Sequence, residues 1–260
     1  MTPLELRQVT VEVAGARILS DVSIKVGERD FVALVGPNGG GKTTLLRVAT
    51  GLQKPTGGTV TLAGTATAHL QPRARAARVA WLPQQALTRA ELQGDRLVVT
   101  SRYRFDETIA AARSGAARAL AAVGASALAE RIITTLSGGE QQRIALAAVL
   151  AQETPLLLLD EPANHLDPVQ QALLYRRLGS LWCSGLAVVC VTHDINLLRH
   201  VSGPAPVRVV GIARGVVRFD LPYGSPQLAP ALSGLWGGRA HEVRGSHGLV
   251  YLVEPPEMME

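Results

Sequence analysis

The chain has 260 residues, of which 47% are hydrophobic and 18% charged, enough for one large domain with its own core. Its formal charge of +5 comes almost entirely from arginine, and no run of five or more basic residues is present, so a nucleic-acid partner is not expected. The only cysteines, Cys183 and Cys190, exclude a disulfide framework, and we expect both to be buried, reduced thiols.

The sequence also lacks the segments that target a chain into or across a membrane. No apolar run approaches the roughly 18 to 20 residues that cross a bilayer as a helix. The opening residues, MTPLELRQVT, have neither a basic start nor an apolar secretory core. We therefore expect a soluble, cytoplasmic chain.

Short strand-like runs alternate with alanine-rich stretches of helical length. Residues 1–27 read as strands of a small antiparallel layer, and the glycine-flanked run at residues 56–64 adds a strand to it. The runs FVALV, LLLLD and LAVVCV are continuously apolar, as is typical of parallel strands that are covered on both faces. These patterns predict an α/β fold with a mainly parallel sheet.

A glycine-rich segment links the strand at residues 31–35 to a helical pattern. It fits G-x-x-x-x-G-K-[ST], in which glycines let backbone N–H groups surround a phosphate at a helix N-terminus. Lys42 would reach the β- and γ-phosphates, and the Thr43 hydroxyl would bind Mg²⁺. A glycine-rich turn alone can simply redirect the chain, but strand, Lys-Thr pair and helix occur here in order, so we predict nucleotide binding. The candidate residues are Gly36, Pro37, Asn38, Gly39, Gly40, Gly41, Lys42, Thr43 and Thr44.

The stretch at residues 85–136 is rich in alanine and arginine, and we interpret it as an inserted, mainly helical part. After it, Ser137 and two glycines open a predicted helix that continues over residues 143–151. Ser137 could be an ordinary N-cap or part of an anion site, because hydroxyl and N–H donors converge at a helix start.

The run LLLLDEP ends an apolar strand, residues 156–159, in two adjacent carboxylates. Ligands collect at the carboxyl ends of parallel strands, so a strand beside the phosphate-loop strand would bring Asp160 to the Mg²⁺ site. Glu161 would remain free to polarise an attacking water. The alternative is a pair of helix N-caps, which Pro162 would tolerate. The upstream phosphate loop favours the metal and water roles.

Two further polar residues carry weaker signals. His193 follows the apolar run at residues 186–191 and so lies at the carboxyl end of a strand, but a lone histidine there is usually a satisfied core residue. Gln84 reads as a loop residue. Without further information, neither residue would be assigned a function.

The C-terminal part predicts a hairpin that turns at residues 213–215, followed by a short helix and closing strands. Three side chains in this part could suggest a metal site, but scattered exposed residues are the favoured interpretation. These side chains are Asp220, His241 and His247.

The string LSGGEQQRIALAAVLAQETPLLLLDEP completes a set of motifs that follow one another over residues 36–193. With them, nearly the whole chain resembles the nucleotide-binding subunits of ATP-binding cassette transporters. The resemblance implies a single domain, residues 1–260, with a P-loop NTPase (RecA-like) core and an antiparallel β layer. It also implies that residues 85–136 form an inserted helical signature subdomain and that residues 205–260 form a C-terminal hairpin and tail.

The resemblance assigns roles to matched positions. Residues 36–43 resemble the Walker A loop, and residues 156–160 resemble the Walker B strand, which precedes the catalytic carboxylate. Gln84 resembles the glutamine that senses the γ-phosphate, and His193 resembles the switch histidine that contacts it. The implied catalytic residues are Lys42, Gln84, Glu161 and His193, and the implied metal ligands are Thr43, Gln84 and Asp160.

The resemblance also implies a cross-subunit site. Ser137 and Gly139 match the signature that caps the γ-phosphate bound by the opposite subunit, and Asp167 matches the loop that communicates between the two sites. Two copies, or two related chains, would then close head to tail around two MgATP molecules. The signature residues implied to bind nucleotide are Ser137, Gly138, Gly139, Glu140 and Gln141.

The implied function is that of an ATPase subunit at the cytoplasmic face of the inner or plasma membrane, held there by a transmembrane permease. The tail and the run DEPANHLDP, with Ala163 in place of the usual threonine, are similar to those of importers of iron chelates, cobalamin, haem or metal ions. Such a system would include an extracytoplasmic substrate-binding protein. An exporter subunit, or a soluble cassette ATPase in iron–sulfur assembly or another non-transport role, remains the alternative.

The sequence departs from the family pattern at two places. The position of the aromatic residue that usually stacks on adenine is Val13 here, which predicts similar hydrolysis of GTP and ATP, because such stacking contributes ~1 to 3 kcal/mol. The segment between Gln84 and Ser137, which usually contacts the permease, is short for the family.

Overall fold

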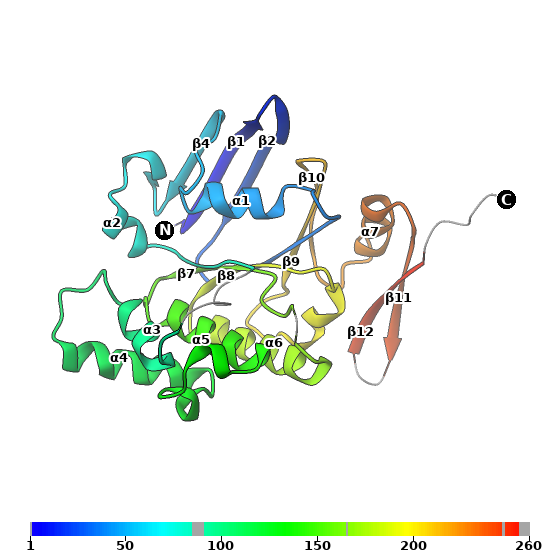
Figure 1. The fold of residues 1–260 in the computed structure, drawn as a ribbon. Coiled ribbons are helices and arrows are strands. Elements are labelled where there is room, and N and C mark those ends of the chain that lie inside the picture. The colour runs from blue at the N-terminus through cyan, green and yellow to red at the C-terminus, as the bar shows by residue number, and fades with distance from the viewer. Residues whose placement is uncertain (1, 85–90, 165, 246–247, 255–260) are drawn as a thin grey trace.

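The main sheet has six strands, in the order β10-β9-β3-β8-β7-β6. The computed structural model describes residues 2–84, 91–164, 166–245 and 248–254 (Figure 1). All neighbouring strands of this sheet are parallel except β9 and β10. The strands are β3 (Phe31–Val35), β6 (Ala80–Leu82), β7 (Leu156–Asp160), β8 (Ala187–Val191), β9 (Arg208–Ala213) and β10 (Val216–Pro222).

The central strands are continuously apolar because both faces of the sheet are covered. In β3, Phe31, Ala33 and Val35 pack into the hydrophobic core on one face, whereas Val32 and Leu34 pack into the core on the other. Every residue of β3, β7 and β8 is buried. The predicted α/β fold with a mainly parallel sheet is confirmed.

The predicted neighbour of the phosphate-loop strand was wrong. We expected β7 beside β3, but β8 lies between them and pairs with both. The continuous apolar pattern indicates burial on both faces, and it carries no information on which buried strands are adjacent. The carboxyl ends of β3, β7 and β8 still meet at the same edge of the sheet.

The antiparallel layer over the N-terminal part is confirmed. Its order is β2-β1-β4-β5, and it shares one hydrophobic core with the helix α1 and one face of the main sheet. Figure 1 shows this layer at the top, with α1 between it and the main sheet. The elements are β1 (Leu4–Val13), β2 (Ala16–Val26), α1 (Lys42–Ala49), β4 (Gly57–Leu62) and β5 (Thr65–Ala66).

Helices α5 and α6 cover the opposite face, and α3 and α4 lie beside them (Figure 1). The range expected to be an inserted helical subdomain contains α3 and α4 in its described part. None of the described helices is long and apolar enough to cross a bilayer. The helices are α2 (Pro72–Ala76), α3 (Gly94–Thr100), α4 (Ile109–Ala122), α5 (Gly138–Leu150) and α6 (Pro168–Cys183), with short 3-10 turns η1 (Thr67–His69), η2 (Ser126–Leu128) and η3 (Ile133–Thr135).

Of the two cysteines, Cys190 is buried in β8, but Cys183 is exposed, so the expectation of two buried thiols was wrong for Cys183. Cys183 is the last residue of α6 and follows Trp182, whose ring is buried. Consecutive helical residues point in directions about 100° apart, so burial of Trp182 turns Cys183 toward solvent.

The C-terminal part contains the expected hairpin, helix and closing strands. The β9–β10 hairpin turns through residues 214–215, and then come α7 (Leu228–Trp236), β11 (Arg239–Gly245) and β12 (Gly248–Glu254). Asp220 is bonded to Arg208, and His241 lies 3.7 Å from Glu254. His247 lies outside the described residues, as do residues 85–90. The remaining 3-10 turn is η4 (Ile195–His200).

Candidate nucleotide-binding site

The predicted phosphate loop is fixed by close contact with the β9–β10 hairpin. At Gly36, whose φ is 147°, an added Cβ would lie 1.9 Å from the Ile212 carbonyl oxygen. The N–H of Gly215 donates to the Gly40 carbonyl at 3.1 Å. Gly41 has a φ of 101° and caps α1. Only glycine fits at these close backbone contacts and positive φ angles without strain. The glycines therefore define the conformation of the loop.

Lys42 begins α1 and points back into this loop. The residue is 6% exposed, and its Nζ donates to the carbonyls of Gly36 and Pro37 at 2.8 and 2.9 Å. Burial lowers the pKa of Lys42, while the charges of Glu161 and Asp160 oppose that change. A buried cation beside a glycine-rich loop at a helix N-terminus is an anion-binding arrangement.

A cavity of about 630 Å³ lies in front of the loop. It brings together residues predicted from separate motifs, namely the loop, Gln84, Glu161 and His193. Val13 is half exposed and is not among the lining residues, and none of the lining residues is a Phe, Tyr or Trp. The lining residues are Ile18, Asn38, Gly39, Gly40, Gly41, Lys42, Thr43, Thr44, Gln84, Glu161, Asn164 and His193.

Asp160 ends β7 beneath this cavity and fits the role of a Mg²⁺ ligand. It is 1% exposed, and among the described residues neither of its carboxylate oxygens has a hydrogen-bond partner. Burial raises the pKa of Asp160, and the nearby Thr43 hydroxyl and the charge of Lys42 only partly oppose this. A buried carboxylate without a partner is costly unless a cation or donor joins it. Together with the nearby Thr43 hydroxyl, which lines the cavity, it provides the hard oxygen ligands that Mg²⁺ prefers.

Glu161 follows in a strained backbone conformation, with a φ of 52°. Its carboxylate accepts from Gln84 Nε2 at 2.7 Å and from Asn164 Nδ2, and it contacts His193 Nε2. Two residues distant in the sequence, Gln84 and His193, and one from the next turn, Asn164, thus hold one carboxylate in the lining of the cavity. Strain of this kind is common at functional sites, and here the side-chain contacts stabilise it. The helix-cap alternative for the carboxylates is not seen, because α6 begins later with Asp167 as its N-cap.

Asn164 and Ile18 line the site and were missed in the sequence. For Asn164 the only signal was a polar side chain three residues after the carboxylate, a spacing at which a turn brings the two together. Ile18 lies in β2 and gave no signal, because its place depends on how the antiparallel layer packs on the phosphate loop.

The LSGGE segment forms a second surface. Ser137 is the N-cap of α5 and forms a capping box with Glu140. The amide of Gln141 donates to the carbonyls of Ile133 and Leu136, at 3.1 and 3.2 Å, and so braces the turn before the helix. Sequence reasoning left Ser137 as either a cap or an anion site, and the structure establishes the cap. A cap still leaves the N–H groups of Gly138 and Gly139 at the positive end of the helix.

This second surface and the nucleotide cavity have no lining residue in common. A cavity of about 480 Å³ lies beside the start of α5, and Asp167 lines it while capping α6 at 2.9 and 3.0 Å. A nucleotide in the first cavity would therefore not contact Ser137 of the same chain. The lining residues are Ser137, Gly138, Gly139, Glu140, Arg143, Leu166, Asp167 and Gln170.

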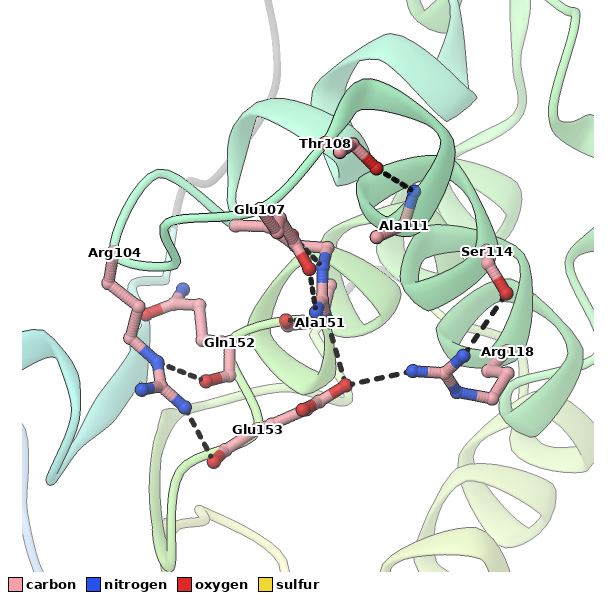
Figure 2. Close-up of polar contacts among 10 residues, drawn as sticks. Arg104, Glu107, Thr108, Ala111, Ser114, Arg118, Ala151, Gln152 and Glu153 are labelled. Atoms are coloured by element: carbon pink, nitrogen blue, oxygen red, sulfur yellow. Dashed lines mark hydrogen bonds and ion pairs between the residues drawn. The ribbon is translucent and has the colours of Figure 1, made fainter.

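The far end of α5 is held by a buried charge network (Figure 2). Arg102, in the loop between α3 and α4, is only 5% exposed. Its Nε and Nη2 donate to both carboxylate oxygens of Glu107, at 2.7 and 2.9 Å. Its Nη1 donates to the Ala151 carbonyl at 2.9 Å and to Glu153 at 2.8 Å. These charged bonds hold the pKa of Arg102 above its ordinary value.

Arg104 strengthens the same attachment, as Figure 2 shows. It donates to the carbonyls of Gln152 and Glu153 at 2.7 and 3.0 Å. The α3–α4 loop is thereby fastened to the turn between α5 and β7. That turn joins the helix that begins after Ser137 to the strand that ends at Asp160.

Comparison with known proteins gives matches over most of the chain. The family model described as ABC transporter matches residues 19–164. The cobalamin import ATP-binding protein BtuD of Halobacterium salinarum is 40% identical over 251 residues, covering 87% of this chain but 63% of that relative's length. The hemin import ATP-binding protein HmuV of Gloeobacter violaceus is 39% identical over 203 residues, covering 75% of this chain and 74% of the relative.

Solved structures give the same fold. A dimeric ATP-binding cassette in a post-hydrolysis state, bound to ADP and Pi, is 27% identical with a TM-score of 0.76, covering 84% of this chain and 98% of that chain. A nucleotide-free cassette from an ABC transporter has a TM-score of 0.78 at 19% identity, covering 90% of this chain and 96% of that chain. At that lower identity the likeness concerns the fold alone.

Proposed function

The chain belongs to the ABC transporter family, and we propose that it is an ATP-hydrolysing subunit that drives a membrane importer. The observation that carries the enzymatic part is that buried Lys42 and the held carboxylate of Glu161 line one cavity, while the buried carboxylate of Asp160 directly precedes Glu161 at the end of β7. A site that only binds nucleotide needs a cation such as Lys42. Hydrolysis also needs a metal ligand and a group that orients the attacking water.

In the proposed reaction, the phosphate loop and Lys42 bind the β- and γ-phosphates and neutralise their charge. Mg²⁺, held by Thr43, Asp160 and Gln84, would withdraw charge from the phosphate oxygens. Glu161 accepts a hydrogen bond from the attacking water and, with His193, orients it in line with the bond to be broken. A new bond forms between water oxygen and the γ-phosphorus, the bond to the bridging oxygen breaks, and ADP and phosphate leave.

We propose that the working unit is a dimer of this chain or of two related chains. The nucleotide cavity and the Ser137 surface are separate on one chain, so residues of both motifs can reach one nucleotide only across an interface between two chains. A head-to-tail arrangement gives two equivalent sites, as the symmetry of a dimer requires. The ADP-bound cassette with which the chain shares its fold is itself dimeric.

The proposed partner is a transmembrane permease, which would hold the chain at the cytoplasmic face of the membrane. Two large apolar side chains, Leu52 and Tyr103, are each 62% exposed. Arginines of α2 contact the residue next to each in the sequence: Arg75 lies near Gly51, and Arg73 donates to the Arg104 carbonyl at 2.7 Å. Exposed apolar side chains among cations suit a partner with apolar and acidic groups.

The names of the relatives favour import, with cobalamin or haem as the cargo class, and an extracytoplasmic substrate-binding protein would then belong to the system. An iron chelate or a metal ion fits the same importer group. We also propose that the site accepts GTP nearly as well as ATP, because no aromatic ring of the described residues lines the cavity for base stacking. Parallel turnover assays test this, and a large preference for ATP would contradict it.

The test of the transport role is capture of the tagged chain from gently solubilised native membranes, followed by mass spectrometry. Recovery of a many-spanning permease, in an amount comparable to the tagged chain, is the expected result. Recovery of soluble partners alone would contradict the transport role and favour the alternative of iron–sulfur assembly. The sequence of the permease would then distinguish an importer from an exporter.

A further inference from the structure

We propose that Asn196, held by the C-terminal β11–β12 hairpin, is a positioning residue for His193. The inference rests on the proposed function, in which His193 helps to orient the attacking water. It assigns to the C-terminal tail a part in catalysis, although none of the tail's described residues lines the nucleotide cavity.

Asn196 joins the hairpin through both ends of its side-chain amide. Its Nδ2 donates to the Tyr251 carbonyl at 3.0 Å, and the Tyr251 N–H donates to its Oδ1 at 2.7 Å. The side chain thus pairs with one residue of β12 as a neighbouring strand would. Because donor and acceptor are both used, the amide has one preferred orientation, and the backbone at Asn196 is held with it.

The hairpin is itself anchored, so it can serve as a support. Tyr251 is 1% exposed, its ring meets the Tyr223 ring edge-on at 5.6 Å, and its hydroxyl accepts from the Gly224 N–H at 3.2 Å. The Tyr223 hydroxyl donates to the Leu249 carbonyl at 3.0 Å. A two-stranded hairpin alone is marginally stable. These contacts fix it to the end of β10.

The segment that carries His193 needs such a support because its inner side is not filled. A cavity of about 180 Å³ lies behind it, lined among others by Glu161, Asn164, Thr192 and His193. On the chain before His193, the Thr192 N–H is bonded to the Leu34 carbonyl of β3 at 3.1 Å. After it, Asn196 provides the next side-chain link to another element.

Asn196 therefore acts on orientation rather than on folding. Ile195 and Leu198 are 3% and 1% exposed and anchor η4 in the core without it. The His193 ring contacts Glu161, and a small shift of the backbone moves that ring relative to the attacking water. Misplacement by about 1 Å can reduce a rate by up to roughly 100-fold.

The experiment compares ATP turnover of the full chain in wild type, Asn196→Ala and Ser233→Ala. Ser233 is the matched control, because its Oγ accepts from the Ala240 N–H at 2.8 Å and fastens the same hairpin to α7. Asn196→Ala is expected to lower kcat roughly 10-fold and leave KM for ATP within about two-fold, since the phosphate loop is untouched. Ser233→Ala is expected to change neither.

Faster amide exchange over residues 193–196 in Asn196→Ala, but not in Ser233→Ala, is the accompanying expectation. Asn196→Asp provides a milder change, because it keeps the acceptor for the Tyr251 N–H and loses the donor, and it should lower kcat in the same direction. Unchanged kcat in both Asn196 variants, or an equal loss in Ser233→Ala, would overturn the proposal. Wild-type turnover that persists in Lys42→Ala would instead contradict the proposed function.

Discussion

Glu161 is the residue whose surroundings define the proposed chemistry most narrowly. Its carboxylate is held by Gln84, Asn164 and His193, and its backbone has a φ of 52°. Each of the three partners comes from a different segment, so the carboxylate depends on the fold as a whole. A side chain held in this way loses little entropy when a substrate and water arrive, which is how preorganised sites act.

Replacing Glu161 by Gln should separate binding from hydrolysis. The amide keeps the size and polarity of the side chain but is a much weaker acceptor for the proton of water, so turnover should fall at least roughly 100-fold. ATP affinity should stay within about three-fold, because the phosphate loop is unchanged. Steady-state phosphate release and equilibrium binding measure the two effects. Near-normal turnover would contradict the role of Glu161.

The ionised side chain of Asp160 should lower the free energy of unfolding of the nucleotide-free protein. Both of its buried oxygens lack partners among the described residues, so Asp160→Asn should raise the free energy of unfolding by about 1 to 3 kcal/mol and Tm by several degrees. Thermal unfolding in EDTA measures this gain. Conversely, MgATP should stabilise the wild type and have little effect on the variant.

The pH dependence of that gain follows from the pKa of Asp160. Burial raises this pKa, so the ionised form is disfavoured in the folded state, and the cost is present above the raised pKa. As the pH falls through this raised pKa, Asp160 becomes protonated in the folded protein. Below about pH 3.8, its ordinary pKa, Asp160 is protonated in the folded and the unfolded protein alike. The difference in Tm between Asp160→Asn and wild type should therefore close toward acid pH. A constant difference would point to packing instead.

At the scale of elements, the α3–α4 loop is attached to the end of α5 by charge rather than by apolar packing. Gly115 of α4 leaves the space that the Arg102 side chain occupies, because a Cβ at this position would lie 2.3 Å from the guanidinium carbon. A buried ion pair adds little over a well-packed apolar pair, but removal of one partner leaves an uncompensated charge. The attachment is therefore sensitive to single substitutions.

Glu107→Ala should lower the midpoint of urea denaturation, because the buried Arg102 guanidinium would keep only Glu153 and the Ala151 carbonyl as partners. Glu5→Ala removes the exposed pair with Arg7 and is the control, with a midpoint expected to stay close to that of the wild type. Equally small decreases of the midpoint in the two variants would show that the network does not hold the loop.

The sequence predicted what depends on local spacing. The phosphate loop, the strand before it and the position of Lys42 could be predicted because turn, strand and helix signals lie within one short segment. The strand that pairs with β3 could not be predicted, because a continuous apolar run indicates that a strand is buried but not which strand lies beside it. The same limit applied to Arg102, whose bond to the Ala151 carbonyl depends on packing between distant segments, whereas Asn164 reaches Glu161 through a local turn.

At the scale of the whole molecule, the motifs of one chain line two separate cavities, and in the proposed dimer a complete site needs both chains. Lys42 and Glu161 line the nucleotide cavity, whereas Ser137 lines the separate cavity at the start of α5. Spacing along the sequence cannot reveal this separation, and only the family resemblance suggested it. The consequence is that nucleotide affinity and assembly should respond to different substitutions.

A charge placed at the start of α5 should block assembly while sparing nucleotide binding. In a Glu161→Gln background, ATP should convert monomers to dimers, because hydrolysis no longer reopens them, as light scattering after gel filtration would detect. Ser137→Arg in that background should keep ATP affinity within about three-fold and remain monomeric, since the added side chain occupies the surface that meets the partner's nucleotide. If Ser137→Arg instead weakened ATP binding by the monomer as strongly as Lys42→Ala does, both motifs would serve one nucleotide within a single chain, and the two-chain site would be wrong.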